Sequence, residues 1–244
     1  MILTLRPPRF LDAGEAALIV EFGSTVDPEI NDRVVALDEN LTSLNVPGVI
    51  ETVPTYRSLM IHYDPLVLTR EALVVAITSI EARPVLSRKP KNVWTIPCCY
   101  EPPYGEDLSE VEVSLAMEET RVIKLHSEAT FRVYMYGFAP GFCYLGGLPK
   151  ELDISRRPMP RAAHASNAIL MAGGLSLIAT FPMPTGWWVI GRTPVRMYSP
   201  SRHPGFLMQI GDLVRFVPIN ANQFDLMEQQ SLAGEIVARH ETLP

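Results

Sequence analysis

Arginine side chains in the second half of this 244-residue sequence could hold an anionic ligand. Arg156, Arg157 and Arg161 lie close together in a proline-rich stretch, residues 155–161, and Arg192 precedes a Thr-Pro pair. A guanidinium group offers a planar fork of N–H donors that fits a carboxylate or a phosphate. The sequence therefore predicts an anion site, with a solvated loop or a contact between subunits as the alternative for this stretch.

Histidine and cysteine supply the other candidates for chemistry. His126 and His164 could transfer protons, although neither stands at a spacing that indicates a partner serine or carboxylate. Cys98, Cys99 and Cys143 form no Cys-x-x-Cys pair, which favours free thiols in a reducing cytoplasm. A nucleophilic Cys143 is the alternative. The sequence predicts no metal site in this chain.

Glycine is concentrated in the same half of the chain. Residues 136–142 form a turn-rich segment after an expected strand at 131–135, and glycine pairs stand at 146–147 and 173–174. None of these segments matches a nucleotide-binding fingerprint. Glycines let backbone N–H groups approach a ligand, but they also let strands turn the corners of a β-barrel. The spacing favours barrel corners, and it leaves Trp187 either in the core or in a pocket wall.

Charge is distributed unevenly along the chain. The whole sequence has 21 basic and 27 acidic side chains, a net charge of −6. Residues 129–211 hold eight basic and two acidic side chains, a balance of +6, which leaves −12 for the rest. The acidic total excludes a general nucleic-acid binder, and no apolar run has the roughly 18–20 residues of a membrane helix. Because residues 1–10 contain no signal-peptide core, we expect a cytoplasmic protein with an anion site in its basic middle.

The first half of the chain is expected to form a domain of its own. Period-2 alternation indicates strands, and apolar residues every three or four positions indicate helices. The expected order, β-α-β-β-α-β, is that of a ferredoxin-like sandwich, with a domain boundary near residues 83–92. Its members are expected at residues 17–22, 27–44, 49–53, 58–63, 69–80 and 93–96. Helices are also expected within residues 107–126 and over residues 224–239.

Several short motifs occur in order over nearly the whole chain. They include Arg9-Phe10-Leu11-Asp12-Ala13-Gly14, Tyr56-Arg57-Ser58-Leu59, Gly137-Phe138-Ala139-Pro140-Gly141-Phe142, Tyr144-Leu145-Gly146-Gly147-Leu148, Gly186-Trp187, Ile190-Gly191-Arg192-Thr193-Pro194 and Gly211-Asp212. In these motifs the sequence resembles the allophanate hydrolase subunit 1 family, which also contains the B component of 5-oxoprolinase and the Kip sporulation-kinase inhibitor.

This resemblance implies an α+β fold, with a ferredoxin-like domain over residues 1–90 and a cyclophilin-like β-barrel domain over residues 91–244. It implies a larger partner, subunit 2 (the C component of 5-oxoprolinase), and a third subunit. With them the chain would take part in the ATP-dependent hydrolysis of a small anionic amide or lactam such as 5-oxoproline. Inhibition of a sensor histidine kinase, as in Kip, is the alternative. A third candidate activity, prolyl isomerisation, is suggested by the cyclophilin-like barrel fold alone.

The resemblance also implies a site in a cleft over the barrel. His126 and His164 are expected to act in catalysis, while Arg161 and Arg192 hold the anion and glycine-loop N–H groups stabilise an oxyanion. The residues expected to bind the substrate are Gly137, Phe138, Pro140, Gly141, Tyr144, Arg161, Gly186, Trp187, Arg192 and Thr193. The sequence departs from the family pattern at residues 164–168 and at residues 175–177, where Leu-Ser-Leu replaces the usual Gln-Thr-Gly. This departure predicts a different substrate or ligand chemistry.

Overall fold

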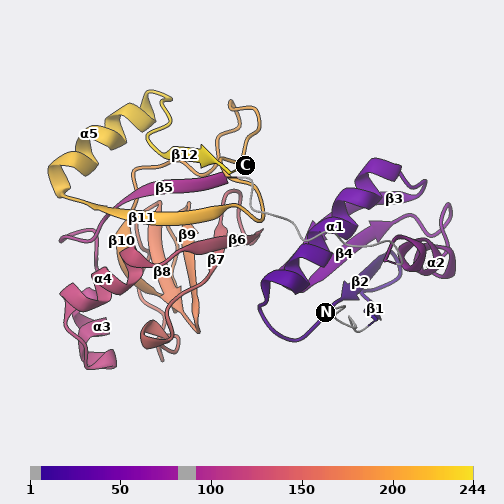
Figure 1. Ribbon diagram of the computed structural model, residues 1–244, viewed down its shortest axis with the longest axis horizontal. Coiled ribbons are helices and arrows are strands. Elements are labelled where there is room, and N and C mark those ends of the chain that lie inside the picture. The colour runs from indigo at the N-terminus through magenta and orange to yellow at the C-terminus, as the bar shows by residue number, and fades with distance from the viewer. Residues whose placement is uncertain (1–6, 82–91, 244) are drawn as a thin grey trace. The chain divides into compact units, whose positions relative to one another are not determined.

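Residues 7–81 and 92–243 are described by a computed structural model, in which the chain forms two units, residues 1–89 and 90–244 (Figure 1). Each unit has a hydrophobic core of its own. No helix in the described part of the chain is long and apolar enough to cross a membrane.

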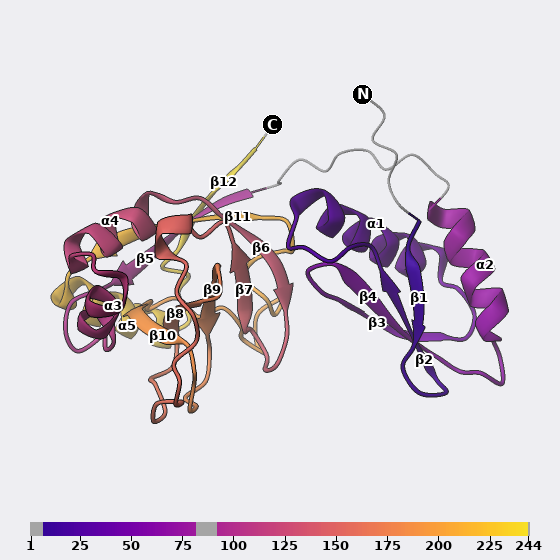
Figure 2. The same ribbon diagram turned by 90° about the horizontal axis from the view of Figure 1, so that it is seen from below.

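The first unit is a four-stranded antiparallel sheet with two helices (Figure 2). The strands follow the order β1-β2-β4-β3. The elements are β1 (Arg9–Asp12), β2 (Ala17–Glu21), α1 (Pro28–Leu44), β3 (Val49–Pro54), β4 (Ser58–Tyr63) and α2 (Arg70–Glu81). Alternate side chains of β2 and β4, including Leu18, Val20, Leu59 and Ile61, are buried against the helices, as the period-2 pattern predicts.

Local signals start both helices of this unit. The Asp27 side chain accepts a hydrogen bond from the Glu29 N–H at 2.8 Å, and Pro28 occupies the first turn. The Thr69 hydroxyl accepts from the Ala72 N–H at 3.2 Å. These caps confirm the two helices expected from the sequence.

The prediction of a closing strand at residues 93–96 is wrong. This segment lies in β5 (Asn92–Cys99), which belongs to the second unit and pairs there with β10 (Trp188–Arg192), β11 (Leu213–Ile219) and β12 (Arg239–Thr242). The sheet edge beside β2 is occupied instead by β1, antiparallel to it. In the described part of the first unit, the expected β-α-β-β-α-β order therefore lacks its last strand.

The second unit is built around a closed seven-stranded barrel. The strands follow the order β10-β8-β9-β7-β6-β11-β5, and pairing of Arg192 in β10 with Cys99 in β5 closes the ring. The remaining barrel strands are β6 (Phe131–Tyr136), β7 (Cys143–Gly146), β8 (Ala168–Ala172), β9 (Leu175–Ala179), β10 (Trp188–Arg192) and β11 (Leu213–Ile219). Phe131, Leu145 and Phe216 are among the fully buried side chains of its interior.

Helices cover parts of the barrel. The helices of this unit are α3 (Leu108–Leu115), α4 (Glu119–Glu128), a short 3-10 turn (Lys150–Leu152) and α5 (Ala221–Leu232). Helix α4 packs on β11 and α5 packs on β5 (Figure 1). The helix expected at residues 224–239 is wrong at its C-terminal end, because the chain turns at Gly234 (φ 98°) and then forms β12 (Arg239–Thr242) beside β5.

Candidate functional site

The glycine-rich loop between β6 and β7 is a tight, internally bonded turn. The Gly137 N–H donates to the Phe142 carbonyl at 3.2 Å, and the Phe142 N–H donates to the Ala139 carbonyl at 3.0 Å. Gly141 has a φ of 79°, and a β-carbon there would lie 2.6 Å from the β-carbon of Tyr198. Glycine is therefore required at this position by the backbone and by the neighbouring side chain.

The loop delivers aromatic side chains to the outer face of the barrel. Phe142 and Trp187 belong to a hydrophobic cluster formed by the side chains that alternate with the interior ones on β8, β9 and β10. The Tyr144 and Trp187 rings lie 6.4 Å apart edge to face, and the Phe138 and Phe142 rings lie 5.4 Å apart. Phe138 is 76% exposed. We call these four side chains the aromatic face.

Most of the residues expected to bind a substrate lie at or beside this aromatic face. The Pro140 carbonyl accepts a hydrogen bond from the Thr180 hydroxyl at 2.7 Å, which ties the loop to the end of β9. Gly186 directly precedes Trp187, and the Arg156 guanidinium lies 5.5 Å from the centre of the Trp187 ring. Burial raises the pKa of the Tyr144 phenol, and the positive charge of Arg156 offsets part of this effect.

Arg161 lies apart from these rings, in a network of ion pairs. Its guanidinium donates to Asp107 Oδ1 at 2.7 Å and also pairs with Glu106. The neighbouring Arg157 pairs with Asp107 at 3.3 Å and with Glu110 at 2.8 Å. The structure therefore does not favour Arg161 as an anion holder, because carboxylates of the chain already occupy both terminal nitrogens and its Nε is buried.

Asp107 is the residue that the sequence analysis missed. Its side chain is buried and its Oδ2 accepts from the Val189 N–H at 2.7 Å, while its own N–H donates to the Val189 carbonyl at 2.8 Å. The carboxylate thus joins two arginines to strand β10. An aspartate directly before an expected helix is a signal for a cap, but it gave no indication of these distant partners.

Arg192 and Thr193 also lie apart from the aromatic face. The Arg192 guanidinium donates to Glu228 in α5 at 2.7 Å and to the Ser166 carbonyl at 2.8 Å, and it lies 5.0 Å from the centre of the Phe224 ring. The Thr193 side chain is fully buried and accepts a hydrogen bond from a neighbouring backbone N–H. Both residues hold the end of β10 in place, so neither donates freely to a ligand.

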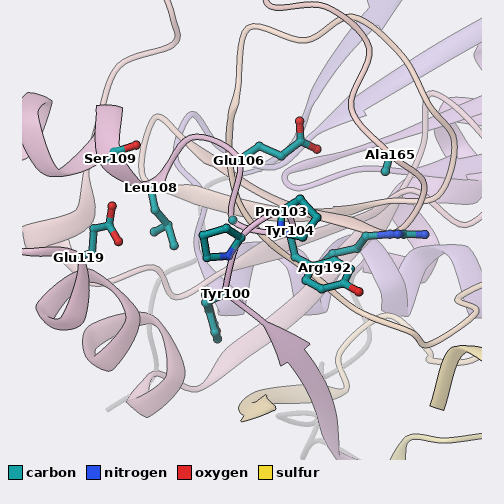
Figure 3. Close-up of a pocket in the computed structure, with 11 residues that line it drawn as sticks. Tyr100, Pro103, Tyr104, Glu106, Leu108, Ser109, Glu119, Ala165 and Arg192 are labelled. Atoms are coloured by element: carbon teal, nitrogen blue, oxygen red, sulfur yellow. The ribbon is translucent and has the colours of Figure 1, made fainter. Parts of the chain in front are cut away.

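A pocket of about 620 Å³ lies at this end of β10 (Figure 3). Its lining residues are Tyr100, Pro102, Pro103, Tyr104, Gly105, Glu106, Leu108, Ser109, Glu119, Ala165 and Arg192. Glu119 and Arg192 lie on opposite sides of it, and Tyr104 donates to Asp225 at 2.8 Å. Burial and the Asp225 charge raise the pKa of Tyr104 to about 12. Glu106 and Arg192 are already paired, with Arg161 and Glu228, so the remaining charge of this lining is the negative charge of Glu119, which does not favour an anionic ligand.

His126 lies inside the barrel core. Its side chain is fully buried and stacks on Phe216 at 4.7 Å, with Nδ1 2.8 Å from the Tyr100 hydroxyl and Nε2 3.5 Å from the Ser176 hydroxyl. Desolvation lowers the pKa of His126 to about 3, so the ring is neutral. The ring is thus enclosed by Phe216, Tyr100 and Ser176, and this burial does not favour its expected catalytic role.

His164 is buried beside the lining residue Ala165. Its Nδ1–H donates to the Ala165 carbonyl at 2.7 Å, which leaves Nε2 as the acceptor nitrogen. Among the described residues this buried Nε2 has no hydrogen-bond partner. Burial lowers the pKa of His164, so the imidazole is kept in its neutral form.

The three cysteines are free and buried. Desolvation raises the pKa of Cys143, which keeps its thiol protonated and does not favour the nucleophilic alternative. Over residues 7–81 and 92–243, no group of three or more His, Cys, Asp or Glu side chains could hold a metal ion.

Comparison with known proteins decides which family this architecture represents. Residues 8–208 match the family described as carboxyltransferase domain, subdomain C and D. The chain belongs to this family. The carboxyltransferase-domain chain is 31% identical to the B component of 5-oxoprolinase from Escherichia coli O157:H7, over 84% of its own length and 93% of that protein. It is 28% identical to the same component from Bacillus subtilis (strain 168), over 89% and 95% of the two chains.

These relatives confirm the family resemblance stated from the motifs. The carboxyltransferase-domain chain also shares its fold with the urea carboxylase of Kluyveromyces lactis, with a TM-score of 0.79 and 18% identity. That match covers 98% of this chain and 24% of the urea carboxylase. The fold of this chain therefore also occurs as part of a much longer chain.

Proposed function

We propose that this chain is a subunit of an ATP-dependent amide hydrolase of the 5-oxoprolinase type. Two relatives that are named as the B component of 5-oxoprolinase align with it over most of both chains. The observation that carries the proposal is the aromatic face, where Tyr144, Trp187 and the glycine loop come together. The largely exposed Phe138 ring and the half-buried Tyr144 ring are suited to a small ring compound.

The part that this chain plays is binding and orientation. A lactam carbonyl becomes reactive when donors meet the charge that develops on its oxygen. In the glycine loop the N–H groups of Gly137, Ala139 and Phe142 already donate within the loop, so the donors that we assign to this role are the N–H groups of Phe138 and Gly141. Of the two histidines expected in catalysis, the proposal keeps His164, because its Nε2 lone pair has no partner among the described residues.

ATP is assigned to a partner in the complex. The sequence has no phosphate-binding fingerprint, and Arg157, Arg161 and Arg192 already contact carboxylates of this chain. The described residues therefore do not fit a triphosphate. The larger subunit 2, the C component of 5-oxoprolinase, is the expected source of the nucleotide site, and a third subunit is expected beside it.

The test is an assay of the assembled complex. The chain is co-expressed and purified with its neighbouring subunits, and the release of ADP and of the ring-opened amino acid is measured with 5-oxoproline as substrate. We expect equal amounts of both products, and only when all subunits are present. A folded complex that hydrolyses no ATP with 5-oxoproline would refute the proposal. Loss of autophosphorylation of a co-purified sensor histidine kinase would instead support the alternative function.

A further inference from the structure

Arg156 differs from the other arginines expected near the site. Arg157, Arg161 and Arg192 each contact at least one carboxylate of the chain. The exposed Arg156 forms no ion pair with any described carboxylate, and its guanidinium lies over the ring of Trp187. A positive charge in this position is therefore available to a ligand.

The ring beneath Arg156 is a fixed surface. Trp187 is only 8% exposed, its backbone N–H donates to the Thr185 hydroxyl at 3.0 Å, and the Tyr144 ring lies against its edge. A guanidinium that stacks on an aromatic ring uses its flat face, so that its N–H edge stays free to donate in the plane of the group. This edge can make the two parallel hydrogen bonds that a carboxylate accepts.

We propose that Arg156 and Trp187 form a binding site for the carboxylate of a small, flat ring compound. The inference rests on the proposed function and assigns the carboxylate of its ring substrate to one residue, Arg156. One arginine balances one negative charge, whereas a polyphosphate needs several cations. The half-buried Tyr144 side chain, which lies against the edge of Trp187, offers an apolar surface for the ring that carries the carboxylate. Of the basic side chains in residues 129–211, Arg156 is the one that we assign to a ligand at this face.

The experiment titrates the full-length chain with 5-oxoproline and follows tryptophan fluorescence. The matched ligand is 2-pyrrolidinone, the same lactam without the carboxylate, and inorganic phosphate is the competing anion. We expect Arg156→Gln to weaken 5-oxoproline binding roughly 10- to 100-fold, as the loss of a charge-assisted pair requires. Arg156→Lys keeps the positive charge but lacks the planar fork of donors. Its affinity for 5-oxoproline should lie between those of the wild type and Arg156→Gln. Arg196→Gln, at another exposed arginine without a described ion pair, should bind like the wild type.

The outcomes separate this inference from the function on which it rests. Equal affinity of the wild type and Arg156→Gln for 5-oxoproline, both in the chain alone and as KM in the complex, would overturn the inference. Equal binding of 2-pyrrolidinone and 5-oxoproline, or displacement by phosphate at similar concentration, would overturn the assignment to a ring carboxylate. An inactive wild-type complex would refute the proposed function, yet binding to Arg156 would still be measurable. Unfolding curves show that each variant is folded.

Discussion

Removing the Asp107 carboxylate should destabilise the barrel unit strongly. Asp107 is 3% exposed, accepts from Arg161 and from the Val189 N–H at 2.7 Å each, and lies 3.3 Å from Arg157. Breaking a buried pair by removing one partner costs about 3–5 kcal/mol, because the other charge stays buried. Each arginine keeps a second carboxylate, so we expect Asp107→Ala to cost about 3 kcal/mol of the free energy of unfolding, at the low end.

Urea unfolding followed by tryptophan fluorescence measures this change. The three tryptophans, Trp94, Trp187 and Trp188, all lie in the barrel unit, so the signal reports that unit. A loss of about 3 kcal/mol corresponds to a fall in Tm of roughly 6–12 °C for a unit of this size. The control is Glu110→Gln, whose 55% exposed side chain should contribute under about 1 kcal/mol. An Asp107→Ala variant no less stable than Glu110→Gln would refute the reasoning.

Two further predictions concern a histidine and a glycine. The pKa of His126 falls from its ordinary value of 6.5 to about 3 on folding, so between these values the unfolded chain binds a proton that the folded chain does not. This component of stability is complete above pH 6.5 and falls by about 1.4 kcal/mol per pH unit below it. His126→Phe removes it, so urea unfolding at pH 6.5 and pH 5 should show a smaller loss in the variant; equal losses would contradict the shift. Gly141→Ala should cost at least about 1–2 kcal/mol more than Gly173→Ala in the same assay, because both sites have a positive φ but only Gly141 faces Tyr198. Equal losses in the free energy of unfolding for the two variants would show that the loop can move away from Tyr198 without a penalty, which would contradict this reasoning.

Features set by neighbours in the sequence were predictable. Asp27 and Thr69 cap their helices, and the glycine loop after β6 forms a turn, because each depends on a few adjacent residues. The motif resemblance added what local patterns lack, namely the barrel and the grouping of Tyr144 with Trp187.

Features set by distant residues were not predictable. Asp107 and Arg161 are 54 residues apart, and Arg192 and Glu228 are 36 apart, so no local spacing shows that these charges meet. The predicted anion site therefore counted arginines whose donors are already occupied. The segment at residues 93–96 has the right pattern for a strand, but its partners, β10 and β11, lie more than 90 residues further along the chain. Which sheet it joins is decided by packing over the whole unit.

In the proposed function, this chain completes an ATP-dependent lactam hydrolase through its aromatic face. The most direct measurement is the coupled release of ADP and of the ring-opened product from 5-oxoproline, by a complex that contains either the wild-type chain or Trp187→Ala. We predict turnover with the wild type and a large loss with Trp187→Ala in a complex that still assembles. Undiminished turnover with Trp187→Ala, or turnover by the partner subunits without this chain, would contradict the account.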